Sequence, residues 1–301
     1  MSQIVAASPH VTTKNSTAVI MRDVLIALCP ALIAGCVVFG LRALLVVAVT
    51  TAACIFFEWG YEKLCGKPST ICDLSAAVTG VLLAMNLPVS IPLWQAVFGA
   101  LVAMVAVKGL FGGIGKNFAN PALVGRIVLF LSFSKTMTAW VFPDAVSSAT
   151  PLAQLAAGQK PELWTLLLGN HGGCIGETCA LALLLGGAYL LLRGVITWQT
   201  PVCFVGTVFV LSLILGQDAV RQILSGGLLL GAFFMATDYV TAPQTCWGRA
   251  LFGIGAGLLT CLIRFYGSYA EGVSFAILFM NILTPYLSKW TRSKPLGGVP
   301  A

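Results

Sequence analysis

The feature that most constrains this chain is a series of long apolar runs that recurs from residue 24 to residue 288 with short polar segments between them. Only 9% of the residues are charged, whereas a soluble domain carries about 25%. A soluble fold cannot bury this much apolar surface, so the lipid bilayer must act as the solvent for most of the chain. The composition therefore predicts an all-α integral membrane protein.

A membrane-spanning helix needs about 20 mostly apolar residues, and the hydropathy pattern predicts about ten such helices. Their expected ranges are 24–41, 43–58, 74–90, 93–108, 118–134, 177–193, 196–215, 221–237, 249–264 and 271–288. Several are short, notably 43–58 and 74–90. Short or interrupted spans at matching positions of two halves indicate a central binding site.

A long, less apolar segment divides these spans into two groups of five. The end of the third span, "LLAMNLP" (82–88), is matched in the eighth by "FFMATDYVTAP" (233–243). An odd number of spans in each group makes the two halves inverted repeats. The expected organisation is a cytoplasmic segment 1–23, a first five-helix repeat 24–134, an extracytoplasmic loop 135–176, a second five-helix repeat 177–288 and a cytoplasmic tail 289–301.

The basic residues indicate orientation rather than nucleic-acid binding. The net charge is +7, but no basic cluster alternates with aromatic residues, and most Lys and Arg residues fall in the short loops. The positive-inside rule then favours both termini in the cytoplasm, which places 135–176 outside. Residues 1–21 are polar and mixed, unlike a signal peptide.

Two polar stretches interrupt the apolar pattern on the expected cytoplasmic side. "GGIGKNFANPALVGR" (112–126) lacks both ends of a P-loop motif, so Asn117 and Asn120 suggest instead a polar ligand at a broken helix. "ATDYVT" (236–241) holds Thr237 and Asp238, and a carboxylate near a membrane is usually functional or paired. For Asp73, helix capping and a functional role both remain open.

On the expected outer side, "GGCIGETCALALLLGG" (172–187) exposes backbone amides at a helix start, which suits an anion. Glu177 there either caps the helix or holds a polar ring. His10 and His171 have no partners at ligand spacing, so no metal site is expected. The ten cysteines contain no CxxC pair and are best explained as packed or free thiols, with Cys36 and Cys54 kept open as ligands shared with a partner.

The segment "DAVSSATP" (144–151) combines an acid, three hydroxyls and a proline, which locally predicts a turn. Four other blocks occur in order along the chain: "DLSAAVTGVLLAMNLP", "GGIGKNFANPALVGR", "GETCALALLLGGAYLL" and "GAFFMATDYVTAP". From about His10 to Pro285 the sequence resembles the NqrB/RnfD family, whose members are membrane subunits of sodium-pumping NADH:quinone reductases and of Rnf complexes. That resemblance implies a fold like that of urea channels.

The resemblance also implies a covalent cofactor. In this family a flavin transferase attaches FMN to a threonine hydroxyl within a pattern similar to D-(G/A)-x-(S/T)-(G/S)-A-(T/S). Residues 144–150 match every position, so Thr150 is the expected FMN phosphoester site, although a serine stands where glycine is common. The residues expected to be recognised by the transferase are Asp144, Ser147, Ser148 and Ala149. The residues expected around the FMN are Gly176, Glu177 and Thr178.

The implied function is that of a flavin-carrying subunit in a complex that couples ferredoxin-to-NAD electron transfer to sodium or proton translocation, inactive alone. A second, non-covalent flavin (riboflavin) or an ion path is expected at Asn117, Asn120, Thr237 and Asp238, although Tyr239 stands where relatives often have proline. Expected partners are other Rnf membrane subunits, an extracytoplasmic FMN-carrying subunit and the flavin transferase. The expected location is a prokaryotic cytoplasmic membrane, and the alternatives are a channel or transporter for a small solute and a non-redox scaffold.

Overall fold

The computed structural model describes residues 16–140, 149–267 and 272–292, and all regular secondary structure in these ranges is helical. The helices before residue 140 are α1 (Thr17–Phe39), α2 (Leu41–Leu64), η1 (Ile71–Asp73), α3 (Ser75–Met85), α4 (Leu93–Leu101), η2 (Val102–Gly109), α5 (Pro121–Ser132) and α6 (Ser134–Met137). Of these, η1 is a 3₁₀-helix and η2 is a π-helix that continues α4.

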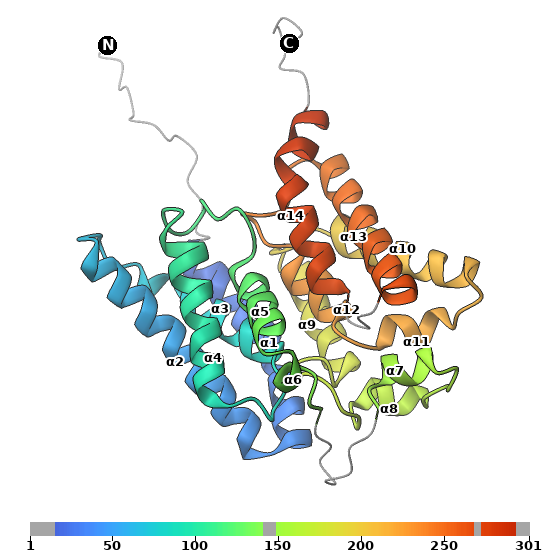
Figure 1. Ribbon diagram of the computed structural model, residues 1–301. Helices are drawn as coiled ribbons and strands as arrows, with labels where there is room; N and C mark the ends of the chain where they lie inside the picture. The colour runs from blue at the N-terminus through green and yellow to red at the C-terminus, as the bar shows by residue number, and fades with distance from the viewer. Residues whose placement is uncertain (1–15, 141–148, 268–271, 293–301) are drawn as a thin grey trace, which may run out of the picture.

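The later helices follow the same pattern of long and short elements. They are α7 (Pro151–Ala156), α8 (Leu163–Leu168), α9 (Ala180–Leu192), α10 (Gln199–Ile214), α11 (Ala219–Leu224), α12 (Leu228–Leu230), the π-helix η3 (Gly231–Met235), α13 (Cys246–Tyr266) and α14 (Val273–Trp290). In Figure 1, α2 and α4 lie on the left and α10 and α13 on the right, with α3, α5, α9 and α12 between them.

Local sequence chemistry explains several helix ends. The Ser16 hydroxyl accepts a hydrogen bond from the Val19 amide and caps α1, and Asn120 caps α5 with a proline at the next position. Gly40 separates α1 from α2 at a φ of 72°, a left-handed backbone conformation that favours glycine. A short hinge therefore joins two long helices.

Each of the ten predicted spans contains a helix, but several of these helices are only about half as long as a membrane is thick. Helices α3, α5 and α9 have 11, 12 and 13 residues, and a rise of about 1.5 Å per residue gives them roughly 16–20 Å. The expected continuous span 221–237 is instead divided into α11, α12 and η3. Within the described residues, three helices (α1, α2 and α13) are long and apolar enough to cross a membrane. The number of crossings therefore stays a prediction.

The ends of the short helices from both halves meet inside the molecule. Beyond the end of α3, the Leu87 carbonyl accepts from the Ile175 amide at 3.1 Å, and the Met85 carbonyl accepts from the Gly176 amide at 2.8 Å. At the end of η3, the Met235 carbonyl accepts from the Asn120 side chain at 3.5 Å. Each half thus supplies a loop that packs on a helix end of the other half.

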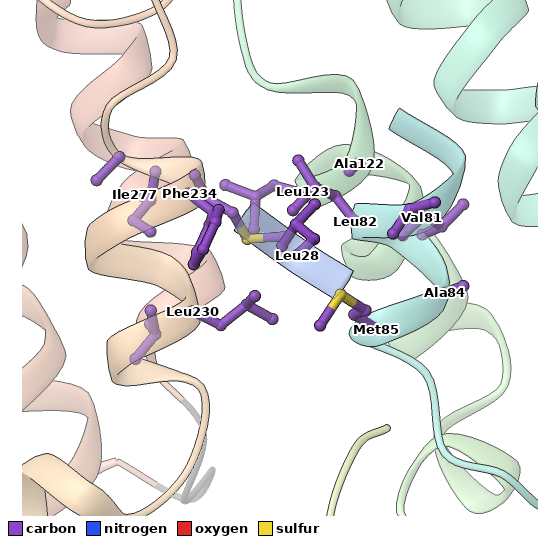
Figure 2. Close-up of a cluster of buried hydrophobic side chains, with 14 of the residues drawn as sticks. Leu28, Val81, Leu82, Ala84, Met85, Ala122, Leu123, Leu230, Phe234 and Ile277 are labelled. Atoms are coloured by element: carbon purple, nitrogen blue, oxygen red, sulfur yellow. The ribbon is translucent and has the colours of Figure 1, made fainter. Parts of the chain in front are cut away.

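A single hydrophobic core joins the two halves. Figure 2 shows Leu28 of α1 and Met85 of α3 beside Leu230 and Phe234 from the second half, all of them buried. The expected repeats 24–134 and 177–288 therefore interlock through a shared core rather than pack as separate units.

Small residues allow the closest helix contacts. On α13, a Cβ at Gly253 would lie 2.7 Å from the Thr200 carbonyl oxygen, and one at Gly257 would lie 3.0 Å from the Phe204 carbonyl oxygen. Both carbonyls belong to α10. Close helix packing is thus confirmed as the role of this GxxxG pair.

Candidate functional site

Thr150 lies at the start of α7 and is the residue that begins this helix. Its hydroxyl accepts a hydrogen bond from the Ala153 amide at 3.3 Å, and the Ala149 carbonyl accepts one from the Gln154 side chain at 3.1 Å. The Thr150 side chain is partly exposed. The structure thus describes Ala149 and Thr150, whereas the predicted recognition residues Asp144, Ser147 and Ser148 lie outside the described residues.

The predicted FMN surroundings at the start of α9 are deeply buried. Glu177 is 3% exposed and Thr178 is fully buried. Gly176 packs so closely on α3 that a Cβ would lie 2.5 Å from the Cβ of Met85. These three residues line the centre of the fold, so their burial does not support direct contact with a flavin at the surface.

Glu177 belongs to a buried polar cluster around Arg126 of α5. The Arg126 guanidinium lies 3.5 Å from a Glu177 carboxylate oxygen, and it donates to the Asn86 side chain at 2.7 Å and to the Ser274 hydroxyl at 2.8 Å. Cys174 completes this cluster, with its sulfur 3.6 Å from the guanidinium and 3.3 Å from the Asn86 carbonyl oxygen. The cluster ties both halves together at the meeting point of the short helices, and it makes Glu177 part of a polar ring rather than a simple helix cap.

A second site collects the other four predicted residues. Asn117, Asn120, Thr237 and Asp238 all line one cavity of about 100 Å³ between α1, α3, η3 and the loop before α5. These residues are far apart in the sequence, and the crossing of the short helices brings them together.

The polar groups of this inner cavity are unequally satisfied. The side-chain oxygen of Asn117 is buried without a hydrogen-bond partner among the described residues. The Thr241 hydroxyl donates to the Asp238 carboxylate at 3.0 Å, and the Thr237 hydroxyl donates to the Phe233 carbonyl at 2.7 Å. An oxygen acceptor without a donor and a nearby carboxylate are the groups that bind a cation or water.

A buried ion pair that the sequence analysis did not single out lies beside the inner cavity. Lys108 of η2 pairs with Glu58 of α2, and their side chains are 5% and 6% exposed. The Lys108 ammonium also donates to the Ser75 hydroxyl at 2.6 Å. The Asp73 carboxylate accepts from the Ser75 amide at 2.8 Å, so Asp73 caps the start of α3 and reaches Lys108 through Ser75.

Arg126, Lys108 and Glu58 share a signal that could have identified them. Each is an ionisable residue within or at the end of a predicted span, a position where charge is expensive and usually functional. Their partners could not have been inferred, because Arg126 and Ser274 are 148 positions apart.

Comparison with known proteins gives a consistent result over nearly the whole chain. The family described as "NQR2, RnfD, RnfE family" matches residues 4–297. The chain is 46% identical to the corresponding subunit of the Na⁺-translocating ferredoxin:NAD⁺ oxidoreductase complex of Acetobacterium woodii, over 97% of this chain and 95% of the relative. It is 41% identical to that of the proton-translocating ferredoxin:NAD⁺ oxidoreductase complex of Clostridium ljungdahlii, over 97% and 96%. It is 37% identical to that of the ion-translocating oxidoreductase complex of Halorhodospira halophila, over 99% and 96%.

Proposed function

Because the chain belongs to the NQR2, RnfD, RnfE family, we propose that it is the RnfD-type subunit of an ion-translocating ferredoxin:NAD oxidoreductase complex. The observation that carries this proposal is similarity over the full length to relatives that are named as such subunits. The protein works with the other Rnf subunits and is inactive alone. Its relatives are named for sodium in one case and protons in another, so either ion remains open.

We propose further that this chain carries FMN through a phosphoester bond to Thr150. Support comes from the seven-residue pattern that ends at Thr150 and from its partly exposed position at the start of α7. A covalent bond keeps a redox carrier in place without a complete binding fold. The flavin would then exchange electrons with an extracytoplasmic flavin-carrying subunit.

The test compares three variants of the intact complex. Thr150→Val removes the hydroxyl, and we expect the denatured chain to lose its flavin fluorescence and the FMN mass on the Thr150 peptide. Thr150→Ser keeps a hydroxyl and should keep part of the flavin. Ser148→Ala is the matched control and should remain fully modified. An unmodified Thr150 in native wild-type protein would refute this assignment.

The proposed setting is a prokaryotic cytoplasmic membrane that the chain crosses several times. Both termini lie in the cytoplasm and Thr150 lies outside, as the distribution of basic residues favours. A flavin transferase must therefore act on Thr150 from the outer side.

For the inner cavity we propose the ion path, with a second flavin as the alternative. About 100 Å³ holds several water molecules or an ion with part of its hydration shell, whereas a flavin requires the cavity to open. Asp238→Asn should reduce ion pumping more than it reduces assembly of the complex. If the purified wild-type complex contains riboflavin that Asn117→Ala removes, the second flavin is the better assignment.

A solute channel and a non-redox scaffold are the competing functions. Crossed short helices with a central polar cluster are also typical of transporters. The Thr150→Val complex separates these possibilities from the redox role. A scaffold or channel would retain full ferredoxin-dependent NAD reduction in this variant, whereas a flavin carrier would lose it.

A further inference from the structure

A cavity of about 540 Å³ lies directly beside the helix that begins at Thr150. Its walls come from α7, from the turn between α10 and α11, from α11 and from the last residues of α13. Figure 1 shows α7 and α11 close together at the lower right. None of the residues assigned above to the inner cavity or to the Arg126 cluster lines it.

We propose that this outer cavity is the docking site for the isoalloxazine ring of the flavin carried by Thr150, an inference that rests on the proposed function. The first argument is reach. The Thr150 hydroxyl lies 3.3 Å from the amide of Ala153, and Ala153 lines the cavity. The ribityl phosphate chain is longer than one helical turn, about 5.4 Å. A ring attached at Thr150 therefore reaches the cavity without any movement of α7.

The second argument is size and chemistry. Ligand pockets of about 300–1,000 Å³ are typical, with apolar and aromatic walls and a few polar groups that orient the ligand, and this cavity falls within that range. Phe265 and Tyr266 supply aromatic rings, and Tyr266 is 73% exposed and thus available for stacking. The side-chain amides of Gln217 and Gln222 match the donors and acceptors of the pyrimidine edge of a flavin.

The third argument is a fixed positive charge. Arg264 lines the cavity, and its guanidinium donates to the Gln222 carbonyl at 2.7 Å and to the Ser225 carbonyl at 3.1 Å. These bonds hold the cation at the wall of the cavity. A flavin gains negative charge at the N1 and O2 side of its ring on reduction, and a nearby cation stabilises that form. The cavity therefore suits the ring in both oxidised and reduced states.

The experiment uses the intact complex and measures how well the ring is shielded. A Thr150→Val complex supplies the signal of all other flavins for subtraction. In Tyr266→Ala we expect native flavin fluorescence and its quenching constant for iodide to rise about two- to tenfold, as expected for loss of an aromatic contact. Tyr266→Phe keeps the ring and should behave as wild type. Tyr286→Ala, at a similarly exposed tyrosine of α14, is the control.

The outcomes separate this inference from the proposed function. A denatured wild-type chain without flavin overturns both. A fully flavinylated Tyr266→Ala chain with wild-type fluorescence and iodide quenching overturns only the docking site. If Tyr266→Ala does not assemble, Gln217→Ala at an exposed position provides the same measurement, and an unchanged signal in that variant overturns the docking site as well.

Discussion

Arg126 is a charged residue held in the interior at the meeting point of the two halves. It is 5% exposed and bonded to groups from α3, α14 and the loop before α9. A buried charge is tolerated only when it is paired and hydrogen-bonded. The cluster therefore defines how the short helices meet.

Arg126→Gln should destabilise the protein by about 3–5 kcal/mol, because it leaves the Glu177 carboxylate buried without its cation. Thermal unfolding of the purified complex measures the effect. The double variant Arg126→Gln with Glu177→Gln should recover part of the loss. A double variant that is no more stable than Arg126→Gln would argue against the ion pair as the cause.

His171, in the loop before α9, is expected to make stability depend on pH. Burial lowers the pKa of His171 below its ordinary value, and hydrogen bonds to the Gly172 and Thr178 backbones oppose this effect only in part. The folded protein thus binds a proton less readily than the unfolded chain. The stabilising effect of the neutral ring is complete above the unfolded pKa, about 6.5, and is lost as the pH falls below it.

We therefore expect the melting temperature of the wild-type complex to fall more steeply than that of His171→Gln as the pH is lowered from above to below the unfolded pKa of histidine, about 6.5. The difference between the two proteins isolates this histidine from other titrating groups. Parallel pH profiles would show that His171 contributes nothing.

At the scale of elements, glycines set how closely the two halves pack. A Cβ at Gly186 of α9 would lie 2.2 Å from the Ala27 carbonyl oxygen of α1. At Gly206 of α10, a Cβ meets nothing within 4 Å. Both glycines lie inside apolar helices, so they form a matched pair.

Gly186→Ala should destabilise the protein by about 1–3 kcal/mol through overpacking. Gly206→Ala should be neutral or stabilising by about 0.5–1 kcal/mol, because alanine favours helix more than glycine does. Melting curves and the yield of folded protein in detergent measure both effects. Equal behaviour of the two variants would contradict the close contact between α1 and α9.

For the whole molecule, membrane orientation is the main consequence of the charge pattern. The proposed topology places the loop that contains Gln159 outside and the loop that contains Cys65 inside. Both residues are exposed. Cysteine labelling in intact cells therefore distinguishes the two sides.

A maleimide that does not cross membranes should label Gln159→Cys in intact cells. The native exposed thiols Cys65, Cys72 and Cys246 should react only after the cells are opened, because their loops face the cytoplasm in this topology. Labelling of Cys65 and not of residue 159 in intact cells would reverse the orientation.

By itself, the sequence determined the helical membrane class, the interruptions in the spans and the pattern that ends at Thr150. These properties are local, because hydropathy, helix caps and a seven-residue motif are read from neighbouring residues. The sequence also identified Asn117, Asn120, Thr237 and Asp238 as polar breaks in apolar segments, which is where a membrane fold carries its sites.

Only the tertiary structure decided which of these breaks meet and which charges are paired. The lengths of α3 and α9 depend on where loops of the opposite half pack against helix ends, and no local pattern encodes that contact. The partners of Arg126 come from segments 40 and 148 positions away. The cavity beside α7 exists because α11 and the end of α13 pack next to it, an arrangement produced by long-range packing of apolar side chains rather than by local sequence.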